Sequence, residues 1–114
     1  MKGIFTFFVL LSLIGLSYNA NAQWTTLTSG TTALLKSVYF SDANTGYAVG
    51  QAGTIYKTVN AGTNWPAQTS GTTKELFSVF FTDANTGYAV GNTGTIVKTS
   101  NAGANWTAQS SGKT

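Results

Sequence analysis

The sequence contains no cysteine, no histidine and no arginine, and its six basic residues are all lysines. Without cysteine there is no disulfide and no thiolate to act as nucleophile or metal ligand. Without histidine the chain lacks the usual general base near neutral pH and the commonest metal ligand. A Ser-His-Asp triad, the usual kind of zinc site and an arginine clamp for anions are therefore excluded within this chain. We predict a chain that is not an enzyme and needs no cofactor or metal.

Charged residues are also scarce, at 8% of the chain. Residues 23–114 carry five lysines against three acidic residues, so their formal charge is 5 − 3 = +2. Charges this few and this evenly spread do not form a nucleic-acid footprint. We therefore expect no nucleic-acid partner.

Residues 1–22 have the pattern of a secretory signal peptide. Lys2 gives a positive start, residues 4–16 are an almost unbroken apolar run, and Ala20-Asn21-Ala22 fits a small-residue cleavage site. The apolar run is shorter than the roughly 20 residues that span a bilayer core. We predict a secreted, periplasmic or cell-surface protein that begins at Gln23 and has no membrane attachment after cleavage. The alternative is an uncleaved membrane anchor.

The rest of the chain is an internal repeat. Residues 24–64 align with residues 65–105 at a constant offset of 41, with 28 identities in 41 positions and no gap. Residues 106–114 resemble the start of a further repeat. We interpret residues 23–114 as one domain of two repeats.

Each copy holds four short runs of β-branched and aromatic residues, separated by glycine-containing turns at roughly ten-residue spacing. The runs are residues 24–28, 34–41, 47–49 and 54–58 in the first copy, and 65–69, 76–82, 88–90 and 95–99 in the second. Four strands in a period of about forty residues are typical of a propeller blade. We predict an all-β chain of two four-stranded antiparallel blades with no helix, as part of a larger β-propeller.

The two faces of each predicted blade are apolar enough to need neighbours. The apolar residues of these faces are Val38, Phe40, Tyr47, Val49, Ile55 and Trp65 in the first copy, and Val79, Phe81, Tyr88, Val90, Ile96 and Trp106 in the second. Because repeat units gain their stability from stacking, two blades with wet outer faces bury little surface. The sequence therefore favours the front of a longer array of blades. The alternative is a two-blade protomer that assembles with copies of itself.

An eight-residue box closes each repeat, at residues 58–65 and 99–106. A glycine supplies a positive φ where the chain reverses, and an asparagine amide can bond backbone groups nearby and hold the turn. A tryptophan then anchors the next strand. The predicted structural residues are Thr58, Asn60, Gly62, Trp65, Thr99, Asn101, Gly103 and Trp106.

These boxes resemble the Asp-box, or bacterial neuraminidase repeat, whose usual form is Ser/Thr-x-Asp-x-Gly-x-x-Trp. The surrounding residues, such as Gly46-Tyr47-Ala48-Val49-Gly50 and Lys57-Thr58, are similar to the photosystem II stability and assembly factor-like branch of that superfamily. The resemblance implies a β-propeller, often of about seven blades, in which the box is a structural turn outside each blade. This chain departs from the pattern because Asn60 and Asn101 replace the aspartate.

Enzymes of the same superfamily need residues that this chain lacks. Sialidases place several arginines on the substrate carboxylate and use a tyrosine nucleophile with a glutamate, whereas Glu75 is the one glutamate here. Propeller glycosidases use two carboxylates across a cleft, and Asp42 and Asp83 are the candidate pair. These aspartates occupy the same position in successive copies, so we expect them to cap turns. Asp42-x-Asn44-x-Gly46 matches the start of a calcium loop but lacks its later acidic ligands.

Two further kinds of side chain allow a binding role or a structural one. Lys57 and Lys98 precede the boxes, and we expect them to be solvated charges at strand edges. The strand aromatics can pack between blades or stack on sugar, and we expect blade packing. They are Tyr39, Tyr56, Phe77 and Phe80.

The sequence predicts a secreted, non-enzymatic propeller module with a scaffold or protein-interaction role, in a fragment of a longer photosystem II assembly factor-like protein. Its expected partners are a protein or further propeller blades, with a glycan or a second copy of the chain as other possibilities. The alternatives in function are a glycan-binding, lectin-like oligomer and a fragment of an Asp-box glycoside hydrolase.

Overall fold

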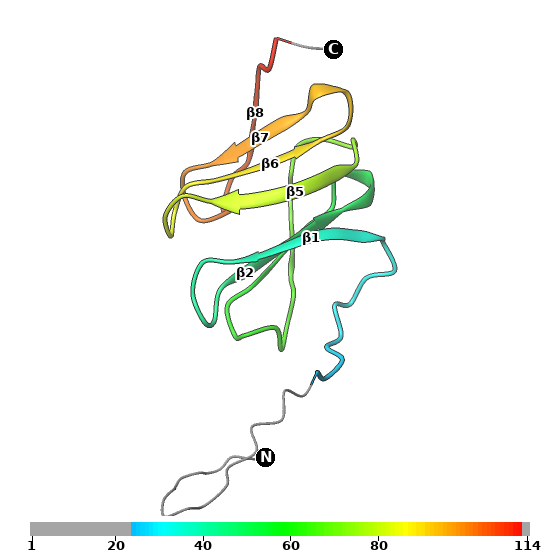
Figure 1. Cartoon of the computed structure of the whole chain (residues 1–114), viewed down its shortest axis with the longest axis vertical. Coiled ribbons are helices and arrows are strands. Elements are labelled where there is room, and N and C mark those ends of the chain that lie inside the picture. The colour runs from blue at the N-terminus through cyan, green and yellow to red at the C-terminus, as the bar shows by residue number, and fades with distance from the viewer. Residues whose placement is uncertain (1–23, 113–114) are drawn as a thin grey trace, which may run out of the picture.

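The computed structural model describes residues 24–112, so the predicted signal peptide at residues 1–22 lies outside the described residues. The described chain forms two four-stranded antiparallel sheets that lie one on the other (Figure 1). The first sheet contains β1 (Leu35–Phe40), β2 (Gly46–Gly50), β3 (Ile55–Thr58) and β4 (Ala67–Gln68); the second contains β5 (Leu76–Phe81), β6 (Gly87–Gly91), β7 (Ile96–Thr99) and β8 (Thr107–Gln109). The predicted all-β class with two four-stranded antiparallel sheets is confirmed.

Each sheet is a meander in which consecutive strands are hydrogen-bonded neighbours. The first turn of each sheet is closed by an aspartate: Asp42 Oδ1 accepts hydrogen bonds from the backbone N–H groups of Asn44 (2.8 Å) and Thr45 (2.7 Å). Asp83 does the same in the second sheet. The expectation that these aspartates cap turns matches this geometry, because a short acceptor side chain can replace a backbone partner two residues on.

The second turn of each sheet is a single 3₁₀ turn, at Gln51–Gly53 (η1) and Asn92–Gly94 (η2). Ala52 and Thr93 have φ values of 61° and 55° in these turns. The sequence offered no signal for these left-handed residues, since alanine and threonine rarely adopt that conformation. No α-helix occurs in residues 24–112, and no helix there is long and apolar enough to cross a membrane.

The pairing register fixes which residues share a face, because successive side chains of a strand point to opposite sides. The aligned rows are Val38–Ala48–Tyr56 and Tyr39–Tyr47–Lys57 in the first sheet, and Val79–Ala89–Val97 and Phe80–Tyr88–Lys98 in the second. The same irregularity of register occurs near the start of β1 and of β5. The two sheets therefore have the same internal construction.

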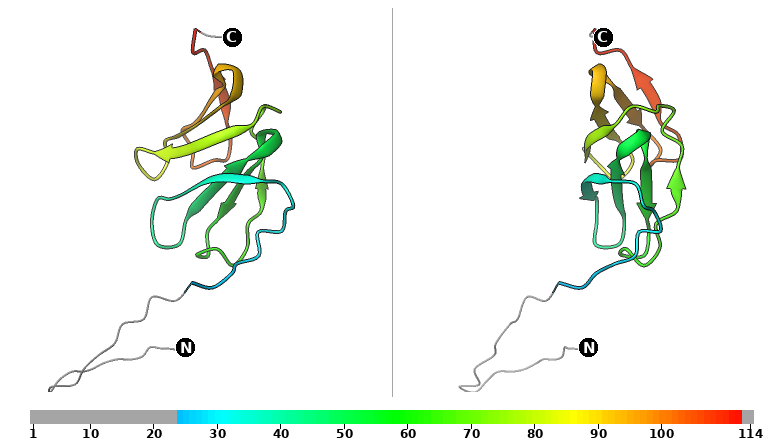
Figure 2. Two further views of the ribbon diagram at one scale, coloured as in Figure 1. Left: turned by 45° about the vertical axis from the view of Figure 1, so that its right-hand side comes forward. Right: turned by 90° about the vertical axis from the view of Figure 1, so that its right-hand side faces the viewer.

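The core lies between the two sheets, which pack face to face (Figure 2). Its buried members are Tyr47, Val49, Ile55, Leu76, Val79, Phe81, Ala89, Val97 and Trp106. The rings of Tyr47 and Phe81 stack with centroids 4.0 Å apart, and the ring of Trp106 meets both edge-on. Stacked and edge-on aromatic pairs add to the stabilisation from buried area.

Half of the apolar residues on the predicted blade faces lie in this core. Tyr47, Val49, Ile55, Val79, Phe81 and Trp106 are buried as expected, whereas Val38, Phe40 and Val90 are exposed and Trp65, Tyr88 and Ile96 are half-buried. These last six belong to the two faces that have no neighbouring sheet within residues 24–112. The rows that they belong to point away from the neighbouring sheet.

The prediction of a strand at residues 24–28 is wrong. Trp24 is almost fully exposed and this segment has no strand structure in the described chain. The edge of β3, where an outer strand can pair, is already taken by β4. The segment instead places Leu27 beside Gly62, where a Cβ on the glycine would come within 2.6 Å of the leucine side chain.

Candidate interaction surface

The two boxes are hydrogen-bonded turns of the same design. In the first box, Thr58 Oγ1 accepts from the Gly62 N–H (2.9 Å) and donates to Asn60 Oδ1 (2.9 Å). Asn60 Oδ1 also accepts from the Asn64 N–H (3.0 Å). The second box repeats these bonds with Thr99, Asn101, Gly103 and Asn105. The structure thus brings together the predicted box residues within each turn.

The asparagine at the usual aspartate position gives the turn one bond that a carboxylate cannot make. Asn60 Nδ2 donates to Asn64 Oδ1 at 2.9 Å, and Asn101 Nδ2 donates to Asn105 Oδ1 at the same distance. An ionised aspartate accepts hydrogen bonds and donates none. The residue before each box glycine, Ala61 in the first box, has a φ of about 58°, a feature that the sequence did not signal.

The box tryptophans have different surroundings. Trp106 is 6% exposed, and its Nε1 donates to Gln68 Oε1 at 3.1 Å. Trp65 is half-buried and meets the ring of Phe40 edge-on at 6.0 Å. The residue at the position equivalent to Gln68 is Leu27, whose side chain has no acceptor.

Polar contacts join the two sheets at the second box. The Tyr47 hydroxyl (3.0 Å) and Lys57 Nζ (2.7 Å) both donate to the Ala102 carbonyl oxygen. Lys57 Nζ also lies 5.5 Å from the centroid of the Tyr47 ring, within the range of a cation–π contact. Burial, and secondly the charge of Asp42, raise the pKa of Tyr47. The expectation that Lys57 is a solvated edge charge was therefore wrong.

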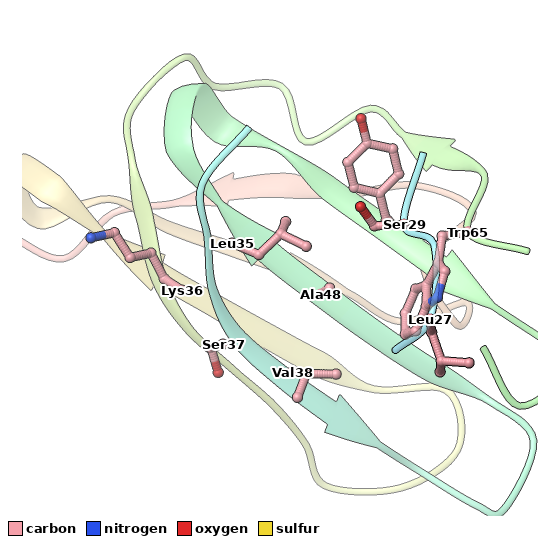
Figure 3. Close-up of a pocket in the computed structure, with 9 residues that line it drawn as sticks. Leu27, Ser29, Leu35, Lys36, Ser37, Val38, Ala48 and Trp65 are labelled. Carbon is pink, nitrogen blue, oxygen red and sulfur yellow. The ribbon is translucent and has the colours of Figure 1, made fainter. Parts of the chain in front are cut away.

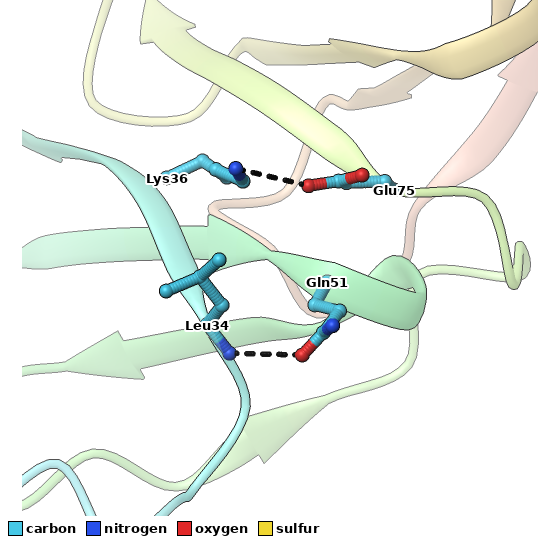
Figure 4. A network of polar contacts seen from close by, with 4 residues as sticks. All are labelled: Leu34, Lys36, Gln51 and Glu75. Carbon is cyan, nitrogen blue, oxygen red and sulfur yellow. Dashed lines mark hydrogen bonds and ion pairs between the residues drawn. The ribbon is translucent and has the colours of Figure 1, made fainter.

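A second group of contacts joins the sheets along β1 and β5. Lys36 Nζ lies 3.3 Å from Glu75 Oε2 across the gap between β1 and β5 (Figure 4). The Tyr39 hydroxyl donates to the Phe81 carbonyl oxygen at 3.2 Å, and its ring packs against Phe80 and Phe81. Tyr39 therefore packs between blades, as expected for the strand aromatics.

The outward face of the first sheet, which carries the row Val38–Ala48–Tyr56, is called the leading face here. It contains a cavity of about 430 Å³ beside the segment that precedes β1 (Figure 3). The cavity is lined by Leu27, Ser29, Leu35, Lys36, Ser37, Val38, Ala48, Tyr56 and Trp65. This lining is mostly apolar, with three hydroxyls and one lysine, which is the composition of a site for an uncharged or mixed side chain.

The outward face of the second sheet, which carries the row Phe80–Tyr88–Lys98, is called the trailing face. Phe77, Phe80 and Val90 are exposed on this sheet. Lys98 Nζ lies 5.6 Å from the centroid of the Tyr88 ring. Contiguous exposed apolar residues mark interaction surfaces, so both outward faces are candidates.

The described residues offer no grouping for acid–base chemistry or metal binding. Asp42 and Asp83 accept backbone hydrogen bonds, which lower the pKa of each. The one described glutamate, Glu75, pairs with Lys36. No group of three or more possible metal-ligating side chains occurs in residues 24–112.

The sheets and the boxes together define a pair of blades from a β-propeller of the Asp-box class. Residues 16–113 match the model of a family described as photosynthesis system II assembly factor YCF48. The chain belongs to this family, which confirms the resemblance read from the boxes.

Two solved structures of YCF48 proteins are similar to the chain. One, described as YCF48 bound to D1 peptide, has a TM-score of 0.65 and 27% identity, over 72% of this chain and 28% of that chain. The other, YCF48 from Cyanidioschyzon merolae, has a TM-score of 0.68 and 21% identity, over 76% of this chain and 30% of that one, and shows the fold alone. The chain thus matches less than a third of the length of either. A comparison with curated proteins finds no match.

Proposed function

We propose that the chain is a non-enzymatic, polypeptide-binding module of an exported propeller scaffold. The observation that carries this proposal is the leading face, where an apolar cavity lies beside an aromatic anchor, Trp65, in a sheet that has no neighbour on that side in the described chain. A related protein, 27% identical over most of this chain, is bound to a D1 peptide. A polypeptide segment is therefore the ligand class that we assign to this face.

The non-enzymatic role rests on the chemistry of the acidic residues. Asp42 and Asp83 are engaged by backbone N–H groups of their own turns. A general acid needs a raised pKa near the working pH, whereas the pKa of each of these groups is lowered. These side chains suit turn capping and not proton transfer.

Export is proposed from residues 1–22, which have a positive start, an apolar run and a small-residue cleavage site. The test is to express the full chain and sequence the N-terminus of the protein recovered outside the cytoplasm. We expect the chain to begin at Gln23. Recovery of intact chain in the cytoplasm or in the membrane fraction would contradict export.

The binding test uses the purified chain 23–114 at low concentration. A synthetic D1 peptide, a scrambled peptide of the same composition and a peptide array are the polypeptide probes, and a polysaccharide array and a sialoside are the contrasting probes. We expect saturable polypeptide binding that Val38→Glu on the leading face weakens at least about tenfold, because it places a charge against an apolar ligand. The matched control is Val59→Glu, since Val59 is equally exposed but lies in the first box.

Two results would overturn the proposal. Retention on the polysaccharide array without any peptide binding would indicate a lectin-like module. Hydrolysis of a sialoside or β-glucan above the level of a Trp65→Ala control would indicate an enzyme.

A further inference from the structure

We propose that the polypeptide that covers the leading face is the second blade of another copy of this chain, so that copies associate head to tail. The inference rests on the proposed function, because it names the partner of the same face. The evidence is the contact between the two sheets of one chain, which serves as a template for the contact between two chains.

The outward faces are the counterparts of the two sides of the existing contact. Within one chain, the row Tyr39–Tyr47–Lys57 faces the row Val79–Ala89–Val97. At the offset of 41, the trailing row Phe80–Tyr88–Lys98 is equivalent to Tyr39–Tyr47–Lys57. The leading row Val38–Ala48–Tyr56 is equivalent to Val79–Ala89–Val97. The trailing face of one copy therefore has the side chains that fit the leading face of another.

The polar groups needed for this joint are also present. Tyr88 is equivalent to Tyr47, Lys98 to Lys57, and the Ala61 carbonyl to the Ala102 carbonyl that accepts both donors. Lys98 already lies over the Tyr88 ring at 5.6 Å, as Lys57 lies over Tyr47 at 5.5 Å. The Tyr88 hydroxyl and Lys98 Nζ of one copy would donate to the Ala61 carbonyl of the next.

One pair of positions distinguishes the joint between chains from the contact within a chain. The ion pair Lys36–Glu75 lies within the chain, and the equivalents of these residues are Phe77 and Leu34. Both are large apolar residues, 47% and 56% exposed. If only one of these two positions carried a charge, that charge would face an apolar side chain of the other copy. Phe77 and Leu34 are both apolar, so no charge is left unpaired. An apolar pair would thus replace the ion pair at the joint.

Residues 24–28 must be displaced from the leading face when such a joint forms. Leu27 lies beside Gly62, and Gln68 lies in the equivalent place beside Gly103. The equivalent of Gln68 in the second blade is Gln109, so Gln109 of one copy and Leu27 of the next would compete for the space at Gly62. Residues 24–28 pair with no strand in the described chain, so moving them breaks no ladder hydrogen bonds.

The two faces of the joint differ, so the association is heterologous. Heterologous contacts form rings when the rotation closes and filaments when it does not. A contact between two different faces does not by itself close a two-fold dimer. The assembly should therefore grow by whole chains and be capped by blocking either face.

The test is sedimentation velocity of the purified chain 23–114 over a roughly thousandfold range of concentration, because association follows mass action. We expect larger species at higher concentration. Val38→Glu on the leading face and Val90→Glu on the trailing face should each weaken association at least about tenfold, since each buries a charge in an apolar joint. Val59→Glu, in the box turn, should leave association unchanged.

Mixing the two blocked variants gives the decisive result. A chain that carries Val38→Glu retains its trailing face, and a chain that carries Val90→Glu retains its leading face. We expect an equimolar mixture to form a 1:1 dimer that does not grow further. A wild-type chain that stays monomeric at every concentration overturns the inference, as does association that survives Val90→Glu but not Val38→Glu.

The failures of the two proposals are distinguishable. A monomeric chain that still binds peptide at the leading face contradicts the assembly and leaves the polypeptide-binding role intact. A chain that assembles head to tail but binds no peptide contradicts the role in binding other proteins and supports the assembly. A chain that neither binds peptide nor associates contradicts both proposals.

Discussion

The two blades have closely similar sequences and different environments. Val79 in the second blade is 5% exposed, whereas its equivalent Val38 in the first blade is 58% exposed. Trp106 is likewise buried beside Gln68, while Trp65 is half-buried beside Leu27. The difference arises because, within residues 24–112, each blade has one neighbour and presents opposite faces to it. Equivalent residues in a repeat protein therefore need not contribute equally to stability.

The largest difference between the blades is expected for the phenylalanine at the end of the first strand. Phe81 stacks between Tyr39 and Tyr47, and Phe40 lies on the outward face. We expect Phe81→Ala to lower the free energy of unfolding by about 3–5 kcal/mol, because it leaves a cavity in the core. Phe40→Ala should cost about 1 kcal/mol or less, as is usual for exposed sites.

Chemical denaturation of both variants, at a concentration where the chain is monomeric, checks this prediction. Equal losses for Phe81→Ala and Phe40→Ala would show that both outward and inward faces are buried in solution. That result would break the comparison between the blades.

The box asparagines should behave alike in the two blades, since their bonds lie within each turn. We expect Asn60→Ala and Asn101→Ala each to lower the free energy of unfolding by about 0.5–1.5 kcal/mol, because the N–H groups of Asn64 and Asn105 lose a hydrogen-bond acceptor at an exposed site. The losses should agree within about 0.5 kcal/mol. A much larger loss for one box would show that its turn depends on the contact between blades.

Removing a tyrosine hydroxyl should destabilise the monomer in the first blade and not in the second. Tyr47 donates to the Ala102 carbonyl across the two sheets. Tyr47→Phe should cost about 0.5–1.5 kcal/mol, the net value of one hydrogen bond. Tyr88→Phe should change the stability of the monomer by less than about 0.5 kcal/mol, and its effect should appear in the association of copies instead. Thermal unfolding and sedimentation of the two variants separate these effects.

The smallest expected effect is a dependence on acid that both blades share. Backbone hydrogen bonds from their own turns lower the pKa of Asp42 and of Asp83 below the ordinary value of 3.8. The stabilisation is complete above that ordinary value and is lost as the pH falls through the lowered values. The double variant Asp42→Asn, Asp83→Asn should therefore lose stability less steeply below about pH 4 than the wild type.

Acid unfolding curves followed by tryptophan fluorescence measure this dependence. Each single variant should remove a similar part of it, because the two turns have the same geometry. If the double variant loses stability at low pH as steeply as the wild type, the pH dependence does not come from these two aspartates. Glu75 is the remaining described carboxylate.

Most of the fold could be predicted from the sequence, and the exposure of its faces could not. The repeat, the first three strands of each blade and the box turns follow from local patterns: glycines at the reversals, asparagine at the turn, and β-branched and aromatic runs between them. The sequence places Val38, Phe40 and Val90 on faces that need neighbours, and the described residues leave these faces open. Alternation along a strand indicates that two faces exist, but the number of neighbouring sheets is not a local property.

The interaction surface could be predicted in part. Its tryptophan, Trp65, was identified as a structural anchor. The cavity beside it depends on where the segment before β1 lies, and residues 24–28 of this segment were predicted to form a strand. Lys57 was expected to be solvated. Its actual partner was missed because the carbonyl that it reaches belongs to the other blade, 45 residues away. Contacts between distant segments carry no short-range signal.

The sequence by itself determined the repeat, the class of fold and the absence of the usual catalytic side chains, because these depend on residue types and their spacing. The tertiary structure decided which of two equivalent residues is buried, which lysine bridges the sheets and which two faces remain open. The physical reason is that burial and long-range hydrogen bonds depend on the stacking of one sheet on another, and nearly identical repeats encode that stacking in the same residues on both sides.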